Sequence, residues 1–317
     1  MFRIVVALLL TLIAGAARAD EPYPSRTVEL IVPFASGGGT DLIARVLAER
    51  LGEALHQPFI VINRPGASTN VGTTVAANAK PDGYTLLLTS ISFTANPTLY
   101  RKLSYAQQDF APIALIANSP SILVVNNALP VKSLGALIAY MKAHPGELNY
   151  ASYGAGSGPH LAAGLFQDVT GTTMQHVPYG GGGPAVAAVL RGEVHVLLAG
   201  ALAVGPQILA GGVRPLAIAA ESRSAALPDI PTFRELGVDY LSGTWFGLLA
   251  PARTPPHVIS KLNAAVLEAL RSEPVRARIS EQGADVVGGS PQHFSRFLKE
   301  ETDRLSAVIR RANIHLD

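Results

Sequence analysis

Two glycine-rich segments carry the residues of this sequence that are best suited to chemistry. The first, FASGGGTD at 34–41, lies between an apolar run and a helical pattern. Free backbone N–H groups, a helix N-terminus and two hydroxyls in one loop can bind an anion, and glycine lets the backbone approach the ligand closely. The alternative is a tight turn in which Thr40 or Asp41 only caps the helix. For Asp41 we expect a cap or a hydrogen-bond anchor, because its charge would repel an anion.

The second segment, SYGAGSGPH at 152–160, has the same design of small residues and hydroxyls, followed by a proline suited to the first turn of a helix. It predicts a second anion-binding loop. His160 would lie in that first turn, where it either donates a hydrogen bond to the ligand or braces the loop, and bracing is the expected role. A third stretch, YGGGGP at 179–184, either adds a phenol and flexible backbone to the same cleft or is a simple strand-to-helix connection.

Other chemistries have little support in the sequence. A chain without cysteine has no thiolate nucleophile, Cys-ligated zinc or iron–sulfur cluster, and the eight histidines form no H-E-x-x-H motif, so we predict no metal and no cofactor. Neither glycine loop continues into G-K-[ST], Pro159 replaces the last glycine of G-x-G-x-x-G, and Ser157 lacks the flanking glycines of a nucleophile elbow. The balance of 25 basic and 23 acidic residues with 6% aromatics argues against nucleic-acid binding.

The elements that must hold these loops follow an α/β rhythm. Strands are predicted at 27–34, 59–63, 84–89, 148–152, 173–177, from 194 and at 245–251, and helices at 40–56, 71–79, 159–170, 184–191, 257–272, between 274 and 283, and from 291. Nearly continuous apolar strands are typical of parallel sheets covered on both faces. The order strand, glycine loop, helix occurs twice, which predicts two doubly wound, mainly parallel lobes flanked by helices. If the lobes face each other, the two glycine loops meet in one cleft.

The N-terminus predicts a secretory signal peptide at 1–19. Arg3 precedes an apolar run at 4–17, and Ala17-Arg18-Ala19 forms an A-x-A cleavage site. That run is shorter than the roughly 20 residues needed to span a bilayer. Cleavage would remove Arg3 and Arg18 and lower the net charge from +2 to zero, so net charge would not steer partners to the protein. The lack of cysteine suits an oxidising compartment, and we expect an exported protein.

Several motifs resemble the substrate-binding proteins of tripartite tricarboxylate transporters, the TctC or Bug type. They are YPSR at 23–26, VPFASGGGTD at 32–41, NRPGASTNVG at 63–72, PDGYTLL at 81–87, ASYGAGSGPHLAAGLF at 151–166, VPYGGGGPA at 177–185, RPLAIAAESRSAALPDIPTF at 214–233, and a W-x-G-L-x-A-P-x-x-T-P pattern from Trp245. The resemblance spans essentially the whole mature chain in the same order. It implies a monomeric, two-lobed periplasmic binding protein of type II-like fold, which closes on a small carboxylate and delivers it to a membrane permease.

The resemblance also implies where the carboxylate binds: the loop at 34–41, the loop at 152–157 and the segment at 90–96, with bridging waters. The predicted ligand-binding residues are Phe34, Ser36, Gly37, Gly38, Gly39, Thr40, Asp41, Ser90, Ser92, Phe93, Asn96, Ser152, Tyr153, Gly154, Ala155, Gly156, Ser157, His160, Tyr179 and Ala199. Where the family often has an aspartate, this chain has GEVH at 192–195 and LAG at 198–200. This departure puts a ligand amino group in doubt and leaves room for an apolar or aromatic body, against which Phe93, Tyr153 and Tyr179 could pack.

The leading hypothesis is a transport protein that binds a mono- or dicarboxylate by hinge closure and is not an enzyme. Lobe I would comprise 20–122 plus 244–317 and lobe II 123–243, with the chain crossing between them near Ser121 and Gly243. Two alternatives remain. One is a sensory subunit that docks on a receptor instead of a permease. The other is a secreted hydrolase or isomerase using Ser157, His160 or Asp41, which would need a nucleophile bonded to a base that these spacings do not reveal.

Overall fold

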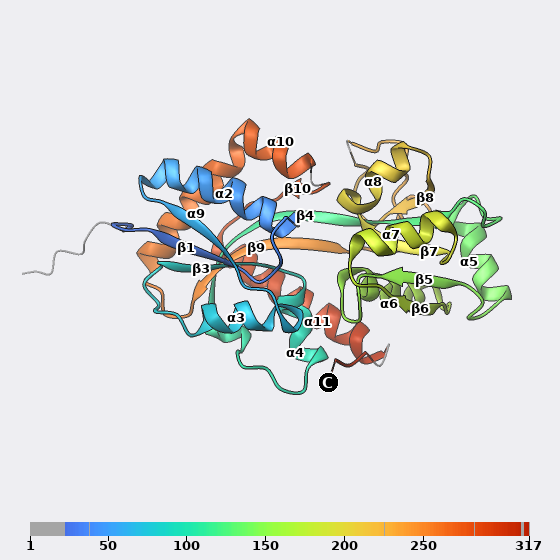
Figure 1. Cartoon of the computed structure of the whole chain (residues 1–317), viewed down its shortest axis with the longest axis horizontal. Helices are drawn as coiled ribbons and strands as arrows, with labels where there is room; N and C mark the ends of the chain where they lie inside the picture. The colour runs from blue at the N-terminus through green and yellow to red at the C-terminus, as the bar shows by residue number, and fades with distance from the viewer. Residues whose placement is uncertain (1–22, 38, 225, 282, 312–313, 317) are drawn as a thin grey trace, which may run out of the picture.

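The computed structural model describes residues 23–37, 39–224, 226–281, 283–311 and 314–316. The predicted signal peptide at 1–19 lies outside the described residues. Within the described part of the chain, no helix has the length and apolar character needed to cross a membrane. Two lobes lie side by side along the long axis of the molecule, connected by the strands β4 and β9 (Figure 1).

Lobe I is built on the first parallel block that the sequence predicts. Strands β1 (Val28–Val32), β2 (Phe59–Asn63) and β3 (Thr85–Ser90) pair in parallel in the order β2-β1-β3, and β3 pairs antiparallel with β9 (Gly243–Pro251). Its helices are α2 (Gly39–Leu55), α3 (Asn70–Ala77), α4 (Ser92–Leu99), α9 (Pro256–Arg271), α10 (Glu273–Glu281) and α11 (Pro291–Arg311). Because side chains alternate along a strand, Leu30 packs with α2, α9 and α10 on one face while Ile31 packs with α3, α4 and α11 on the other.

Lobe II repeats this plan. Strands β5 (Asn149–Ser152), β6 (Gln175–Pro178) and β7 (Val196–Gly200) are parallel in the order β7-β5-β6. Helices α5 (Leu134–Ala143) and α6 (Gly158–Thr170) cover one face of the sheet, and α7 (Gly182–Arg191) and α8 (Ala201–Leu209) cover the other. The apolar run that follows Val194 is a strand only as far as Gly200, where α8 begins.

The 17-residue strand β4 (Phe110–Asn126) passes through both lobes, and the sequence reasoning did not identify it as a strand. Its residues 110–120 pair antiparallel with β9, and residues 121–126 pair antiparallel with β7 and with β8 (Val213–Ile218). The short β10 (Asp285–Val286) also pairs with it. Proline cannot donate to a sheet, and Pro112 lies where the pairing of β4 with β9 shifts register. The crossing strands make the sheets mixed, with the expected parallel strands beside antiparallel ones.

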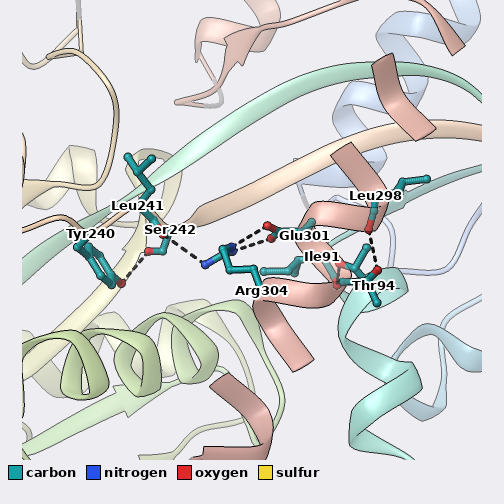
Figure 2. Close-up of polar contacts among 9 residues, drawn as sticks. Ile91, Thr94, Tyr240, Leu241, Ser242, Leu298, Glu301 and Arg304 are labelled. Atoms are coloured by element: carbon teal, nitrogen blue, oxygen red, sulfur yellow. Dashed lines mark hydrogen bonds and ion pairs between the residues drawn. The ribbon is translucent and has the colours of Figure 1, made fainter. Parts of the chain in front are cut away.

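The segment 240–242, through which the chain returns to lobe I, is hydrogen-bonded to both lobes. Arg304 forms an ion pair with Glu301 on the same helix at 2.7 Å and donates a hydrogen bond to the carbonyl oxygen of Leu241 at 3.3 Å. Beside it, the hydroxyl of Ser242 donates to the Tyr240 oxygen, and the Tyr240 hydroxyl donates to the carbonyl oxygen of Ala162 in α6 (Figure 2). The chain therefore returns to lobe I through a hydrogen-bonded segment and not through a free linker. The remaining short 3₁₀ helices, η1 (Ala67–Thr69) and η2 (Gln107–Asp109), lie in lobe I loops.

Candidate functional site

A cavity of about 550 Å³ lies between the lobes, at the carboxyl ends of their parallel strands. In an α/β protein this is where ligands bind. The cavity is lined by Phe34, Gly39, Thr40, Ser90, Ile91, Ser92, Ser119, Tyr153, Ser157, Gly158, Pro159, Gly182, Gly200, Ala203, Thr244 and Phe246. These residues supply hydroxyls, aromatic rings and exposed backbone, and no residue among them carries a charge.

Among the described residues, five helices begin at this cavity. From lobe I they are α2, which begins at Gly39, and α4, which begins at Ser92; from lobe II they are α6, α7 and α8. The first N–H groups of a helix have no partner within the helix, and the aligned peptide dipoles place partial positive charge at the same end. The cavity can therefore stabilise an anion without a lysine or an arginine.

Asp41 fixes the shape of the lobe I loop. Its carboxylate is 2% exposed and accepts hydrogen bonds from the Gly37 backbone N at 2.8 Å, from Arg45 Nε at 3.0 Å and from Asn63 Nδ2 at 2.9 Å. Asn63 Nδ2 also donates to the carbonyl oxygen of Phe34 at 3.1 Å. Burial acts to raise the pKa of Asp41, but the hydrogen bonds from Arg45, Gly37 and Asn63 outweigh it and the pKa is lowered. Asp41 is not among the residues that line the cavity, and its hydrogen bonds hold the loop.

We expect Asp41→Ala to lower the free energy of unfolding by about 1–3 kcal/mol, because it leaves the donors on Gly37 and Asn63 without their acceptor. Since the pKa of Asp41 is lowered in the folded state, its contribution is complete above the ordinary aspartate pKa and is lost as the pH falls through the folded value. Urea denaturation between pH 7 and pH 2.5 measures both effects. Asp303→Ala, which breaks an exposed ion pair with Lys299, is the control and should change stability by less than about 0.5 kcal/mol. Equal losses in the two variants would contradict the anchoring role.

The lobe II loop is held by its own hydrogen bonds. Ser152 is fully buried, and its Oγ lies 2.6 Å from Nε2 of His176 and accepts a hydrogen bond from the backbone N of Gly154. The Ser157 hydroxyl donates to the carbonyl oxygen of Gly154 at 2.7 Å, and the backbone N of Gly156 donates to Nδ1 of His160 at 2.9 Å. Gly154 and Gly156 both have positive φ angles, which glycine adopts without strain.

The structure distributes the predicted site residues among three environments. Those that line the cavity are Phe34, Gly39, Thr40, Ser90, Ser92, Tyr153 and Ser157. Those that hydrogen-bond within or beneath the two loops are Gly37, Asp41, Ser152, Gly154, Gly156 and His160. Tyr179 lies outside the lining, but its backbone N donates a hydrogen bond to the carbonyl oxygen of Ser152 at 3.0 Å. The others outside the lining are Ser36, Phe93, Asn96, Ala155 and Ala199, while Gly38 is not described. Direct ligand contact by any of them stays a prediction.

Two of these predicted residues have clear structural roles elsewhere. Phe93 is 1% exposed and lies in the lobe I core, where its ring stacks with Tyr105 and meets Phe110 edge-on. Asn96 Nδ2 donates to the carbonyl oxygen of Ser68 and to Asn70 Oδ1, both at 2.8 Å, and so connects α4 to η1 and to the start of α3. Both residues stabilise the lobe whose helix α4 begins at the cavity.

Several lining residues were missed by the sequence reasoning. Ser119 on β4 and Thr244 and Phe246 on β9 are isolated positions within the crossing strands, and no local motif distinguishes them. They line the cavity because the strands pass beneath it. The expected crossings near Ser121 and Gly243 were the available signal, since residues next to a crossing lie between the lobes. Ile91, Gly158, Pro159 and Gly182 lie in segments that the sequence associates with the cleft, although they were not named as ligand-binding residues, and Gly200 and Ala203 at the start of α8 were missed.

The chain is similar to known proteins over nearly its whole length. Residues 43–314 match the family described as "Tripartite tricarboxylate transporter family receptor", TctC. Protein BugT of Bordetella pertussis is 40% identical over 308 residues, which cover 96% of this chain and 94% of BugT. This relationship agrees with the resemblance that the motifs indicate.

Two solved structures share the fold and carry bound acids. The structure "R. palustris Rpa4515 with adipate" is 38% identical with a TM-score of 0.82, covering 92% of this chain and 99% of that one. MatC from Rhodopseudomonas palustris with bound malate is 34% identical with a TM-score of 0.78, covering 90% and 100%. The likeness confirms the two-lobed α/β fold of a solute-binding protein. The chain belongs to the TctC family of tripartite tricarboxylate transporter receptors, which are binding proteins and not enzymes.

Proposed function

We propose that this protein captures a small carboxylate between its lobes in the periplasm and delivers it to a permease of the tripartite tricarboxylate type. The observation that carries the proposal is the uncharged cavity at which five helices of the described chain begin. Helix N-termini and hydroxyls from both lobes would bind the carboxylate together. The adipate and malate in the two related structures support this ligand class.

The lining narrows the class of carboxylate. An ammonium group would need a carboxylate or several acceptor oxygens as partners, and no acidic side chain is among the lining residues. Phe34, Phe246 and the ring of Tyr153 instead offer apolar surface. Burial raises the pKa of Tyr153 to about 12, so its phenol is neutral and does not repel an anion. We infer that the ligand is a mono- or dicarboxylate without an amino group and with an aliphatic or aromatic body.

Hinge closure would bring the two loops onto the ligand. The predicted lobe boundaries, 122/123 and 243/244, lie close to the point where β4 changes partner from β9 to β7 and β8, and this change supports them. Bending the two crossing strands would move α6, α7 and α8 relative to α2 and α4. The ligand would favour the closed state by the contacts that it gains only there.

A thermal-shift panel tests the proposed function. We expect adipate, malate, benzoate or terephthalate to raise the melting temperature, because a ligand at about 100 times its Kd adds roughly 2.7 kcal/mol to stability. Matched primary amides such as adipamide and benzamide are the controls and should have little effect. No shift with any carboxylate of a broader panel would contradict the proposal.

Export to the periplasm rests on the predicted signal peptide and on the family. Cleavage after residue 19 would give a mature chain that starts at Asp20. N-terminal sequencing of protein recovered from the periplasm tests this position. A chain that retains Arg3 would contradict it.

A further inference from the structure

Two histidine rings are stacked directly beneath the lobe II binding loop. The rings of His160 on α6 and His176 on β6 have centroids 3.9 Å apart and are inclined by 8°. Tyr150 on β5 stacks on His176 at 5.0 Å. His160 is only 8% exposed and His176 is half-buried, so the stacked pair lies mostly inside the lobe. Neither ring lines the ligand cavity.

Each ring holds one part of the loop. Nδ1 of His160 accepts the hydrogen bond from the backbone N of Gly156, which is possible only while that nitrogen carries no proton. Nε2 of His176 contacts the hydroxyl of Ser152, and the same hydroxyl accepts the Gly154 N–H. The two imidazoles thus hold the residues on either side of Ala155, immediately before Ser157 at the cavity.

The surroundings favour the neutral form of both rings. They border a second cavity of about 390 Å³, in which the ionisable neighbours are Tyr150 from β5, Asp168 from α6 and Arg311 from α11. Asp168 is already paired with Arg311 at 2.6 Å, and the C-terminal segment contributes the apolar Ile314. Burial lowers the pKa of His176, and burial together with His176 lowers that of His160 to about 4.

We propose that His160 and His176 are positioning residues that hold the lobe II binding loop, His160 through the unprotonated Nδ1 of its neutral imidazole, and that protonation of His160 releases Gly156. The backbone at Gly156 also packs closely against neighbouring side chains. A Cβ at this position would lie 2.8 Å from Leu316 Cδ1 and 3.1 Å from Leu99 Cδ1, so this packing limits how far the loop can move. The expected effect on ligand affinity rests on the proposed function. The expected effect of protonation on the loop itself is independent of that function.

The first experiment needs no ligand. In protein labelled with ¹⁵N-glycine, the Gly156 amide and the His160 ring are followed by NMR from pH 8 to pH 3.5. We expect them to titrate together with a midpoint well below the ordinary histidine pKa of about 6.5. In His160→Asn the amide oxygen replaces Nδ1 as acceptor, so the Gly156 signal should no longer follow a histidine titration. A Gly156 amide that ignores the His160 titration would overturn the proposal.

The second experiment separates positioning from packing. Adipate affinity is measured by calorimetry at pH 7.5 for the wild type, His160→Asn and His160→Leu, with His257→Gln as the control. Positioning predicts that Leu weakens binding by about tenfold, the equivalent of one lost hydrogen bond, and that Asn restores it. A packing role predicts the reverse, because Leu would fill the apolar space, and that result would overturn the proposal. If adipate does not bind the wild type, adipate is not the ligand and the NMR titration decides alone.

Discussion

Ser157→Asp should lower the affinity for a carboxylate ligand by about a hundredfold while leaving the protein folded. Ser157 is the N-cap of α6 and lines the cavity. Two like charges about 5 Å apart at an effective dielectric constant of 20 repel each other by roughly 3 kcal/mol, which is about a hundredfold in Kd. The Ser157 side chain makes no capping hydrogen bond to α6, so the helix does not depend on it, and aspartate loses only the hydrogen bond that the hydroxyl donates to the carbonyl oxygen of Gly154. The test is a calorimetric titration with the best ligand of the thermal-shift panel.

Ser157→Asn is the matched control, because asparagine has the shape of aspartate without the charge. We expect its affinity to stay within a few-fold of wild type, because its side-chain amide can donate to the carbonyl oxygen of Gly154 in place of the hydroxyl, and both variants to remain folded in the absence of ligand. Equal loss of binding in both variants would mean that the shape and not the charge of the residue matters. Unchanged binding in Ser157→Asp would place the carboxylate away from α6.

Gly247→Ala should destabilise the protein by about 3 kcal/mol, at the upper end of the usual cost of overpacking. Gly247 lies on β9, and a Cβ there would be 2.1 Å from Cζ of Phe294. Phe294 on α11 is fully buried and meets Trp245 edge-on at 5.8 Å, so its ring has little room to move. Urea denaturation should show a lower midpoint with an unchanged slope. Helix α11 would then be shown to pack on the crossing strand.

The double variant Gly247→Ala with Phe294→Leu provides the internal check. Leucine removes the part of the ring that the new methyl group meets, so the double variant should be less destabilised than the sum of the single variants. Gly135→Ala on α5, where a Cβ meets nothing within 4 Å, should leave stability unchanged or slightly higher. Additive losses in the double variant would contradict the contact between Gly247 and Phe294.

The sequence predicts the elements around the two glycine loops well, because each has a strong local signal. The strand predicted at 59–63 is β2, and the helices predicted at 40–56 and 159–170 correspond to α2 and α6 within one residue at each end. Apolar runs, helical spacing and glycine or proline punctuation lie within a few residues of one another there. Thr40 and Ser157 line the cavity for the same reason, since each loop follows a buried strand.

The crossing strand β4 could not be predicted in the same way. It contains Pro112 and Pro120, which argue against a central strand, and its partners β7, β8 and β9 follow it far along the chain. Ser119 and Thr244 consequently have no local signal, although they form the floor between the lobes. For Phe93 the local sequence pattern was clear, but it does not show which way the side chain points. Helix α4 begins one residue earlier, at Ser92, and it turns the Phe93 ring into the lobe I core.

An uncharged cavity that binds a carboxylate through helix N-termini and hydroxyls should distinguish an acid from its amide. The most direct test is the calorimetric titration of the wild-type protein with the carboxylate that raises its melting temperature most and with the matched primary amide of that acid. We expect one carboxylate to bind per protein molecule and the amide to bind at least about a hundredfold more weakly, because only the anion gains from the helix N-termini. An amide that binds as tightly as its acid would contradict this mode of binding.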